Sequence, residues 1–245
     1  ARLFADERAP WLIKGGYAFE LRYRPNARTT RDLDLSVLGA PEKNAKERLD
    51  AVHTALMSAA ELDLGDYMRF ALARARRELT AAPFGGATFP VQARLGDKPL
   101  GEFYVDVAFS EGPVGSVEEL VGADVLGFAG LPPARVRAIS KAQQFAEKLH
   151  AYTFPWEGRE NTRVKDLVDL VMLIERETIE PEVLRKAATA VFGARRRQSL
   201  PEQLAAPPEA WRERYPELAA QARVRARDVD SAFQLLAEYW SSVAE

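Results

Sequence analysis

Two aspartates one residue apart, Asp32 and Asp34, lie inside an apolar run that is otherwise typical of a strand. They place charge where the pattern favours burial. Because strand side chains alternate between faces, both carboxylates point the same way, with Cα atoms about 6.5–7 Å apart. Two like charges at this separation repel each other unless a cation lies between them. A divalent ion, or a pair about 3.5–4 Å apart, would supply that charge, so the spacing predicts a metal site.

The order of predicted elements divides the chain into two parts. Strands and helices alternate first, and a Gly-Asp-Lys-Pro segment at 96–99 predicts a hairpin turn. Helices follow from Ser140, which is a favourable N-cap residue. We expect an α+β protein with a mixed-sheet domain over residues 1–130 and a helical domain over residues 131–245. The expected strands are 11–13, 32–38, 67–73, 87–95 and 101–109, and the expected helices are 17–23, 42–60, 140–152, 161–177, 181–192, 211–227 and 228–244.

Composition narrows the class of protein. The 245 residues are 47% hydrophobic and 29% charged, which is ordinary for a soluble globular protein. A net charge of −2 gives no global basic field, so any nucleic-acid site must be local. The absence of cysteine excludes disulfides, thiolate zinc sites and cysteine nucleophiles. No apolar run approaches the ~20 residues of a membrane span, so we expect a cytoplasmic protein with no membrane partner.

Two further features surround the aspartate pair. Gly15-Gly16 lies between a strand and a helix, where backbone N–H groups can approach a phosphate closely, and Lys14 beside it either adds a positive charge or is solvated. Asp106 interrupts the apolar run 103–109, and alone it would be interpreted as an edge-strand residue facing solvent. Three carboxylates from two strands can hold two Mg²⁺ ions, so Asp32, Asp34 and Asp106 together are the predicted metal ligands.

This set resembles the DNA polymerase beta-type nucleotidyltransferase superfamily. More narrowly, it resembles the AbiEii/AbiGii toxin family, which includes the MenT toxins of mycobacteria. The motifs that carry the resemblance span residues 14–170 in the family's order. They are Lys14-Gly15-Gly16, Arg28-Thr29-Thr30-Arg31-Asp32-Leu33-Asp34, Glu147-Lys148-Leu149-His150-Ala151 and Arg163-Val164-Lys165-Asp166-Leu167-Val168-Asp169-Leu170.

The resemblance implies a role for each matched residue. Asp32 and Asp34 match the metal-binding pair, and the resemblance implies that residues 1–130 form a nucleotidyltransferase domain. Lys148 matches a helical lysine that meets the triphosphate, Asp166 matches a late catalytic aspartate, and Thr30 stands where a hydroxyl can touch phosphate. Two departures stand out: Gly16 replaces the Ser of many superfamily members, and the interval from Gly16 to Asp32 is longer than usual.

The helical residues also have an ordinary interpretation as a solvated, ion-paired surface. Lys141 and Lys148 share one helix face, and Lys165 is placed to pair with Asp169 four residues later. The two histidines are isolated, and we interpret both as structural. Between residues 193 and 227 the chain has eight Arg against four Glu, which suits either RNA phosphates or a solubilising surface.

The resemblance implies a toxin of a toxin–antitoxin pair that uses Mg²⁺, with Mn²⁺ as a substitute. It would transfer a nucleotide from an NTP to an RNA 3′ end, that of a tRNA, and so block translation. In this scheme Asp106 helps to activate the acceptor hydroxyl, and a cognate antitoxin protein is a partner. Two alternatives stay open: transfer of the nucleotide to a protein or a small molecule, and a binding module whose catalysis is lost.

Overall fold

The computed structural model describes residues 1–27, 30, 32–38, 44–79, 82–156, 158 and 161–244. The chain divides into two compact units. The sheet unit contains Ala1–Arg22, Thr29–Pro113 and Val117–Ile139, and the helical unit contains Tyr23–Arg28, Val114–Ser116 and Ser140–Glu245. The expected α+β architecture, a mixed sheet followed by helices, is confirmed.

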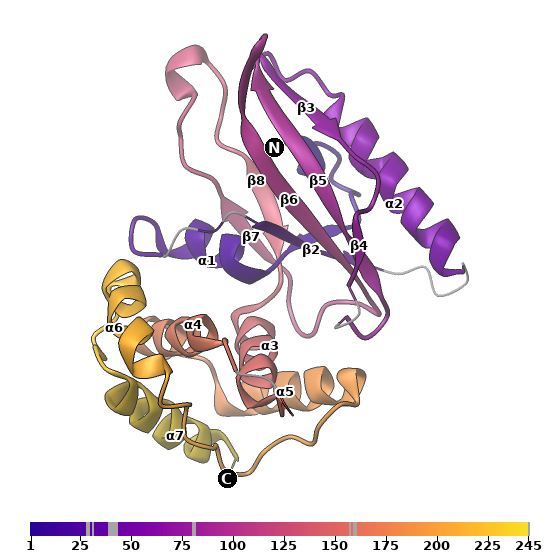
Figure 1. Ribbon diagram of the computed structural model, residues 1–245. Helices are drawn as coiled ribbons and strands as arrows, with labels where there is room; N and C mark the ends of the chain where they lie inside the picture. Colours follow the sequence, from indigo (N-terminus) through magenta and orange to yellow (C-terminus); the bar gives the residue numbers. More distant parts are fainter. Residues whose placement is uncertain are drawn as a thin grey trace. The chain divides into compact units, whose positions relative to one another are not determined.

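The sheet unit is built on one mixed sheet (Figure 1). Its strands run in the order β3-β5-β6-β2-β1-β8-β7, with β4 paired to β5. The β2–β6 and β1–β8 pairs are parallel and the others are antiparallel. The strands are β1 (Trp11–Ile13), β2 (Asp32–Leu38), β3 (Met68–Leu72), β4 (Arg77–Glu78), β5 (Gly86–Leu95), β6 (Lys98–Ser110), β7 (Glu118–Val121) and β8 (Arg135–Ala138).

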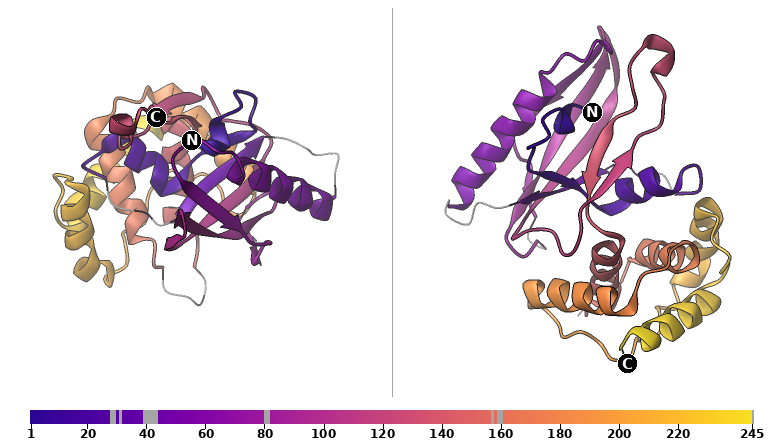
Figure 2. Two further views of the ribbon diagram at one scale, coloured as in Figure 1. Left: turned by 90° about the horizontal axis from the view of Figure 1, so that it is seen from above. Right: turned by 180° about the vertical axis from the view of Figure 1, so that it is seen from behind.

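Strand β2 alternates between two environments. Leu35 and Val37 are buried in the core of the sheet unit, whereas Asp32 is exposed and Asp34 only partly buried on the opposite face. Helix α2 (Ala45–Ala60) contributes Val52 and Leu56 to this core and runs alongside β3 (Figure 2). One face of β2 is therefore anchored by apolar packing, which leaves the aspartate face available for other chemistry.

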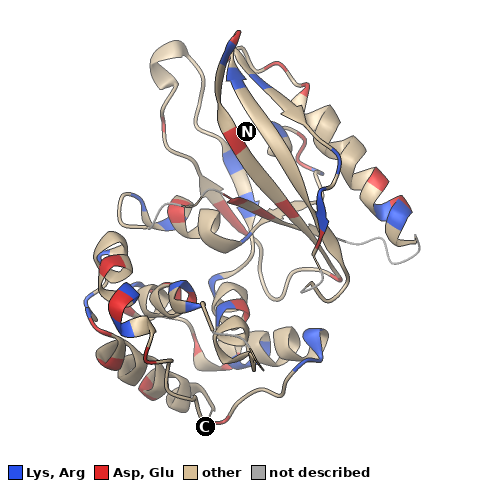
Figure 3. Cartoon of the chain, in the orientation of Figure 1, with Lys and Arg blue, Asp and Glu red and all other residues tan. Residues whose placement is uncertain are grey.

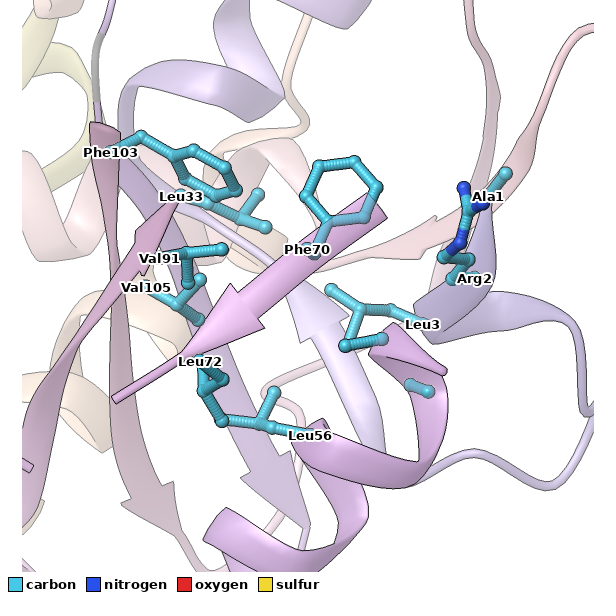
Figure 4. A pocket seen from close by; sticks show the side chains of 12 residues that line it. Ala1, Arg2, Leu3, Leu33, Leu56, Phe70, Leu72, Val91, Phe103 and Val105 are labelled. Carbon is cyan, nitrogen blue, oxygen red and sulfur yellow. The ribbon is translucent and has the colours of Figure 1, made fainter. Parts of the chain in front are cut away.

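An apolar pocket of about 180 Å³ lies behind the aspartates, on the core side of the sheet (Figure 4). Leu33, the residue between the two aspartates, helps to line it together with Leu56 and Val105. Phe70 and Phe103 meet edge to face in its wall, with ring centroids 6.3 Å apart. The 3-10 helix η1 (Arg2–Phe4) is held beside the pocket because the Arg2 guanidinium donates to both carboxylate oxygens of Asp66, each at 2.7 Å.

The helical unit contains α3 (Lys141–Thr153), α4 (Val164–Arg176), α5 (Pro181–Arg195), α6 (Trp211–Ala222) and α7 (Val229–Ala244). Ser140 caps α3, as the sequence predicts, because its side chain accepts a hydrogen bond from the Gln143 amide at 3.1 Å. Nine of the ten residues from Val164 to Leu173 are buried, Lys165 being the exception, so α4 is the central helix of this unit.

Most predicted elements are present with small shifts of boundary. Helix α4 begins at Val164 rather than Asn161, and α6 ends at Ala222 because Arg223 adopts a left-handed conformation with φ of +51°. Helix α1 (Gly15–Tyr23) begins two residues before the predicted start, while the first residues of the predicted helix 42–60 lie outside the described part of the chain. Strands β4, β7 and β8 and the 3-10 helix η2 (Gly127–Ala129) were not predicted.

Strand β8 pairs with β1 and β7 in the sheet, although a domain boundary after residue 130 assigns it to the helical part. Within the described residues, no helix combines the length and the apolar character that crossing a bilayer requires.

Candidate active site

The sheet aligns four polar side chains across adjacent strands. Asp34 of β2 is the register partner of Asp106 of β6, Asp106 is the partner of Thr88 of β5, and Thr88 is the partner of Arg77 of β4. Register partners point to the same face, and neighbouring strands lie about 4.8 Å apart. These four residues, which we call the cross-strand row, therefore bring two of the predicted aspartates side by side. Asp32 lies on the same face, opposite Tyr104.

The Gly15-Gly16 turn lies against Asp34. Gly15 has φ of +60°, and a Cβ atom there would lie 1.9 Å from Oδ2 of Asp34. A Cβ on Gly16 would lie 2.9 Å from Oγ1 of Thr30, and the Lys14 amide donates to the Asp34 carbonyl at 3.0 Å. The first turn of α1 therefore begins directly at the Asp34 carboxylate. A side chain at position 15 would collide with this carboxylate, and the N-terminus of a helix favours an anion nearby.

An open pocket of about 330 Å³ lies along the row on the side of β4 and β5, lined by Asp32, Arg76, Arg77, Thr88, Tyr104 and Asp106. Its walls carry opposite charges, and Figure 3 shows blue positions on β4 near red positions on the sheet. The Arg76 guanidinium donates to the Tyr104 hydroxyl at 3.3 Å. Oδ1 of Asp106 and Oγ1 of Thr88 are buried without a hydrogen-bond partner. Buried polar atoms of this kind call for a ligand, because leaving them unpaired is costly.

The donor set fits a hard divalent cation, since carboxylate oxygens are what Mg²⁺ prefers and Oδ1 of Asp106 has an unused acceptor site. Among the described residues, however, no three His, Cys, Asp or Glu side chains gather closely enough to hold an ion. The three aspartates share a face without forming a closed cage, so metal binding by Asp32, Asp34 and Asp106 stays a prediction.

Lys148 and Asp166 form a different kind of cluster in the helical unit. The Lys148 ammonium lies 2.8 Å from Oδ1 of Asp166 and 2.7 Å from Oδ2 of Asp169, and the two aspartate side chains are only 7% and 1% exposed. Arg163 approaches the other Asp166 oxygen at 3.8 Å. Sequence reasoning paired Asp169 with Lys165, which is instead exposed. The spacing of Asp166 and Asp169 on one face of α4 was the only signal that both could reach one lysine.

His150 is buried in the helical unit, as its structural interpretation predicts, with an exposed fraction of 3%. Its ring packs edge to face on Phe192, with centroids 4.8 Å apart. Burial lowers the pKa of His150 to about 4, and the nearby charges of Arg195 and Arg197 add to this effect. The imidazole is therefore neutral at physiological pH.

Three of the eight arginines between 193 and 227 form ion pairs with carboxylates of the described residues. Arg195 lies 3.6 Å from Glu147, Arg212 binds Asp230 and Glu209, and Arg225 lies 3.7 Å from Glu175. For these three, the ion-paired surface that the sequence allowed is present. Arg28, Thr29 and Arg31 of the resembling motif lie outside the described residues.

A family model and two solved structures match this chain. The family model described as "Nucleotidyl transferase AbiEii toxin, Type IV TA system" matches residues 1–238. MenT4, a nucleotidyltransferase toxin from Mycobacterium tuberculosis, is similar in structure with a TM-score of 0.54 and 18% identity, covering 96% of this chain and 83% of that one. JHP933 from Helicobacter pylori has a TM-score of 0.46 and 13% identity, covering 96% and 84%. No curated protein matches the sequence.

Proposed function

The chain belongs to the AbiEii nucleotidyltransferase toxin family of type IV toxin–antitoxin systems, and we propose that it adds nucleotides to RNA. In this proposal it is a cytoplasmic, Mg²⁺-dependent enzyme that takes a nucleotide from an NTP and joins it to an RNA 3′ end, with tRNA as the preferred acceptor. The addition would inhibit translation, and a cognate antitoxin protein would restrain the enzyme.

The observation that carries this proposal is the pairing of Asp34 with Asp106 on neighbouring parallel strands, directly at the glycine turn that opens α1. Two carboxylates on one face favour a bound cation, and a helix N-terminus favours a phosphate. The same place therefore supports both partners of a metal–triphosphate complex. A divalent ion bound there would neutralise the charge that develops on the transferring phosphate.

The residues of the chain would do three things in the reaction. The first-turn amides of α1 orient the triphosphate, and Asp32 and Asp34 hold its metal. Asp106 accepts the proton of the acceptor hydroxyl, whose oxygen forms a bond to the α-phosphorus. The bond from the α-phosphorus to the oxygen bridging it to the β-phosphorus breaks, and pyrophosphate leaves.

The family resemblance assigns Lys148 to the triphosphate and Asp166 to catalysis, and both roles stay proposals. Two of the three donors of an ammonium are directed at Asp166 and Asp169 here, so a phosphate contact would share Lys148 with these carboxylates. Thr30, whose hydroxyl lies beside Gly16, and Lys14, which follows β1, remain candidates for phosphate contact.

The test is incubation of the purified protein with each α-³²P-labelled NTP, Mg²⁺ and total tRNA. We expect label on the RNA, and we expect Asp106→Asn to lower the rate at least about 100-fold because a catalytic base is lost. Asp97→Asn, in the exposed turn between β5 and β6, is the matched control and should act like wild type.

Label on protein bands instead of RNA would favour the alternative acceptor. The absence of transfer from any NTP to intact tRNA would contradict the RNA proposal. A binding module without catalysis predicts that Asp32→Ala leaves any cellular toxicity unchanged, so abolished toxicity would exclude it.

A further inference from the structure

The pocket between β4 and the carboxylates has a cationic wall that the reaction described above does not use. We propose that Arg76 and Arg77, together with Thr88, bind the last phosphodiester of the acceptor RNA and so present its 3′ hydroxyl to Asp106. This inference rests on the proposed RNA acceptor, and it assigns the acceptor subsite to the β4–β5 side of the carboxylates.

The order of the strands separates the two substrates. From one side to the other, the sheet runs β5, β6, β2 and β1. The glycine turn follows β1 and contacts Asp34, whereas the pocket adjoins Asp106 and Thr88 on β6 and β5. In phosphoryl transfer the attacking and leaving oxygens lie roughly in line across the phosphorus. If the triphosphate occupies the glycine turn, the acceptor must therefore enter from the pocket.

The two arginines are suited to a phosphodiester. A guanidinium binds phosphate with two parallel N–H donors, and it keeps its charge at every relevant pH. Arg77 lies in the cross-strand row two strands from Asp106, which corresponds to about 10 Å between Cα atoms. Neither Arg76 nor Arg77 has an ion-pair partner among the described residues, and both side chains are exposed.

Thr88 and Asp106 supply the second observation that points to a ligand. Oγ1 of Thr88 and Oδ1 of Asp106 are buried, unpartnered and adjacent in the row. A hydroxyl can both donate to a phosphate oxygen and accept from a ribose hydroxyl, while a carboxylate can only accept. Along the row, Arg77 supplies a cation, Thr88 a hydroxyl and Asp106 a base. This order matches a phosphate followed by a ribose with a reactive hydroxyl.

The arginines take no part in bond making. The acceptor hydroxyl gives its proton to Asp106, the oxygen–α-phosphorus bond forms, and pyrophosphate departs on the side of the glycine turn. Arg76 and Arg77 only fix the strand that carries the nucleophile. Replacing them should therefore lower the affinity for the acceptor RNA and leave the affinity for the NTP unchanged.

The first measurement is direct binding, using fluorescence anisotropy of a short labelled single-stranded RNA with a free 3′ hydroxyl. We expect Arg76→Gln and Arg77→Gln each to weaken RNA binding roughly tenfold and to reduce the salt dependence by about one counterion. Arg74→Gln, a neighbouring arginine outside the pocket, is the control and should bind RNA like wild type. All three positions are exposed, and thermal melts should coincide.

The second measurement identifies the phosphate. In an RNA whose last phosphodiester is replaced by an uncharged methylphosphonate, Arg77→Gln should cause no further loss, because the contact is already absent. If the arginine variants raise KM for the NTP and not for the RNA, the subsite belongs to the triphosphate and the inference is wrong.

If the variants bind RNA as tightly as wild type does, the inference is also wrong, whether or not the enzyme transfers nucleotides. An active enzyme with unchanged RNA affinity in the variants would leave the proposed function standing. Tight binding through the arginines without nucleotide transfer would contradict the proposed function alone.

Discussion

The two units use paired aspartates in opposite ways. In the sheet unit, Asp34 and Asp106 lie side by side beside an open pocket, and a buried oxygen of Asp106 has no hydrogen-bond partner. In the helical unit, Asp166 and Asp169 also share one face, and Oδ2 of Asp166 likewise has no hydrogen-bond partner, but Lys148 lies within 2.8 Å of both carboxylates. The first pair lies beside an open pocket that can admit a cation, whereas the second pair is neutralised by a lysine of the chain itself.

The two pairs therefore differ in how their negative charge is balanced, which suits the first to ligand binding and the second to structural support. Buried carboxylates that are already neutralised contribute to stability only as long as their partner remains. Neighbouring carboxylates that repel each other lower the free energy of unfolding. A cation that binds them in the folded state raises it again. Four changes can break or sharpen the contrast.

The largest effect should come from Lys148→Met, which removes the cation between two buried carboxylates. We expect it to lower the free energy of unfolding by about 3–5 kcal/mol, the usual result of leaving buried charge unpaired. Urea titration followed by circular dichroism measures this loss. Lys165→Met, on the exposed side of α4, is the control and should stay within about 0.5 kcal/mol of wild type.

Removing the negative charges as well should restore stability. The variant Lys148→Met with Asp166→Asn and Asp169→Asn should be clearly more stable than Lys148→Met alone. If it is not, the lysine stabilises α3 by packing and not by charge, and the contrast between the two pairs is smaller than we infer.

The second change is acidification, which should act on the helical unit through His150 on α3. Its pKa lies near 4 in the folded protein against an ordinary 6.5, so the unfolded chain binds more protons between these values. Above pH 6.5 His150 is neutral in both states and does not change the free energy of unfolding. As the pH falls from 6.5 toward 4, the free energy of unfolding decreases by up to about 3 kcal/mol. The free energy of unfolding, measured against pH for wild type and for His150→Gln, isolates the effect of this histidine. If the two curves run parallel, His150 does not cause the loss.

The third change is addition of Mg²⁺, which should stabilise only the protein with its open carboxylates intact. At a concentration one hundred times Kd, a ligand specific for the folded state adds about 2.7 kcal/mol. We expect the melting temperature of wild type to rise with Mg²⁺, and that of Asp34→Asn or Asp106→Asn to rise less. An equal rise in these variants would place the bound metal elsewhere.

The last comparison is Gly15→Ala against Gly65→Ala, the second of which should have the smallest effect on stability. Both glycines have positive φ, +60° and +71°, so each substitution costs about 1–2 kcal/mol of backbone strain. A Cβ meets nothing within 4 Å at Gly65, but it collides with the Asp34 carboxylate at Gly15. Nucleotide transfer should therefore fall at least about tenfold for Gly15→Ala and not for Gly65→Ala, because only the first displaces Asp34, which we propose to hold the metal.

The sequence predicted the strand of the site better than its surroundings. The bounds of β2, Asp32–Leu38, are those expected, because alternating apolar residues mark a strand with one buried face. Strand β4 contains only Arg77 and Glu78 and has no such pattern, so its position depends on pairing with β5. The cationic wall of the pocket could not be predicted for this reason.

The register between strands that are distant in the sequence could not be predicted either. Nothing local indicates that β2 pairs in parallel with β6, or that this register aligns Asp34 with Asp106 instead of with a neighbour. Likewise, Asp169 binds a lysine on another helix in preference to the Lys165 beside it in the sequence, because burial of α4 directs Asp169 inward and leaves Lys165 in solvent.

The parallel pairing of β2 with β6 also sets the earliest time at which the proposed aspartate site can assemble. Asp34 is synthesised early, but its partner arrives only when β6 has been translated and has joined the sheet. A nascent chain emerges from the ribosome N-terminus first, and it cannot assemble the aspartate row until that strand is free to fold. The enzyme that we propose to act on the translation machinery is therefore inert throughout the first part of its own synthesis.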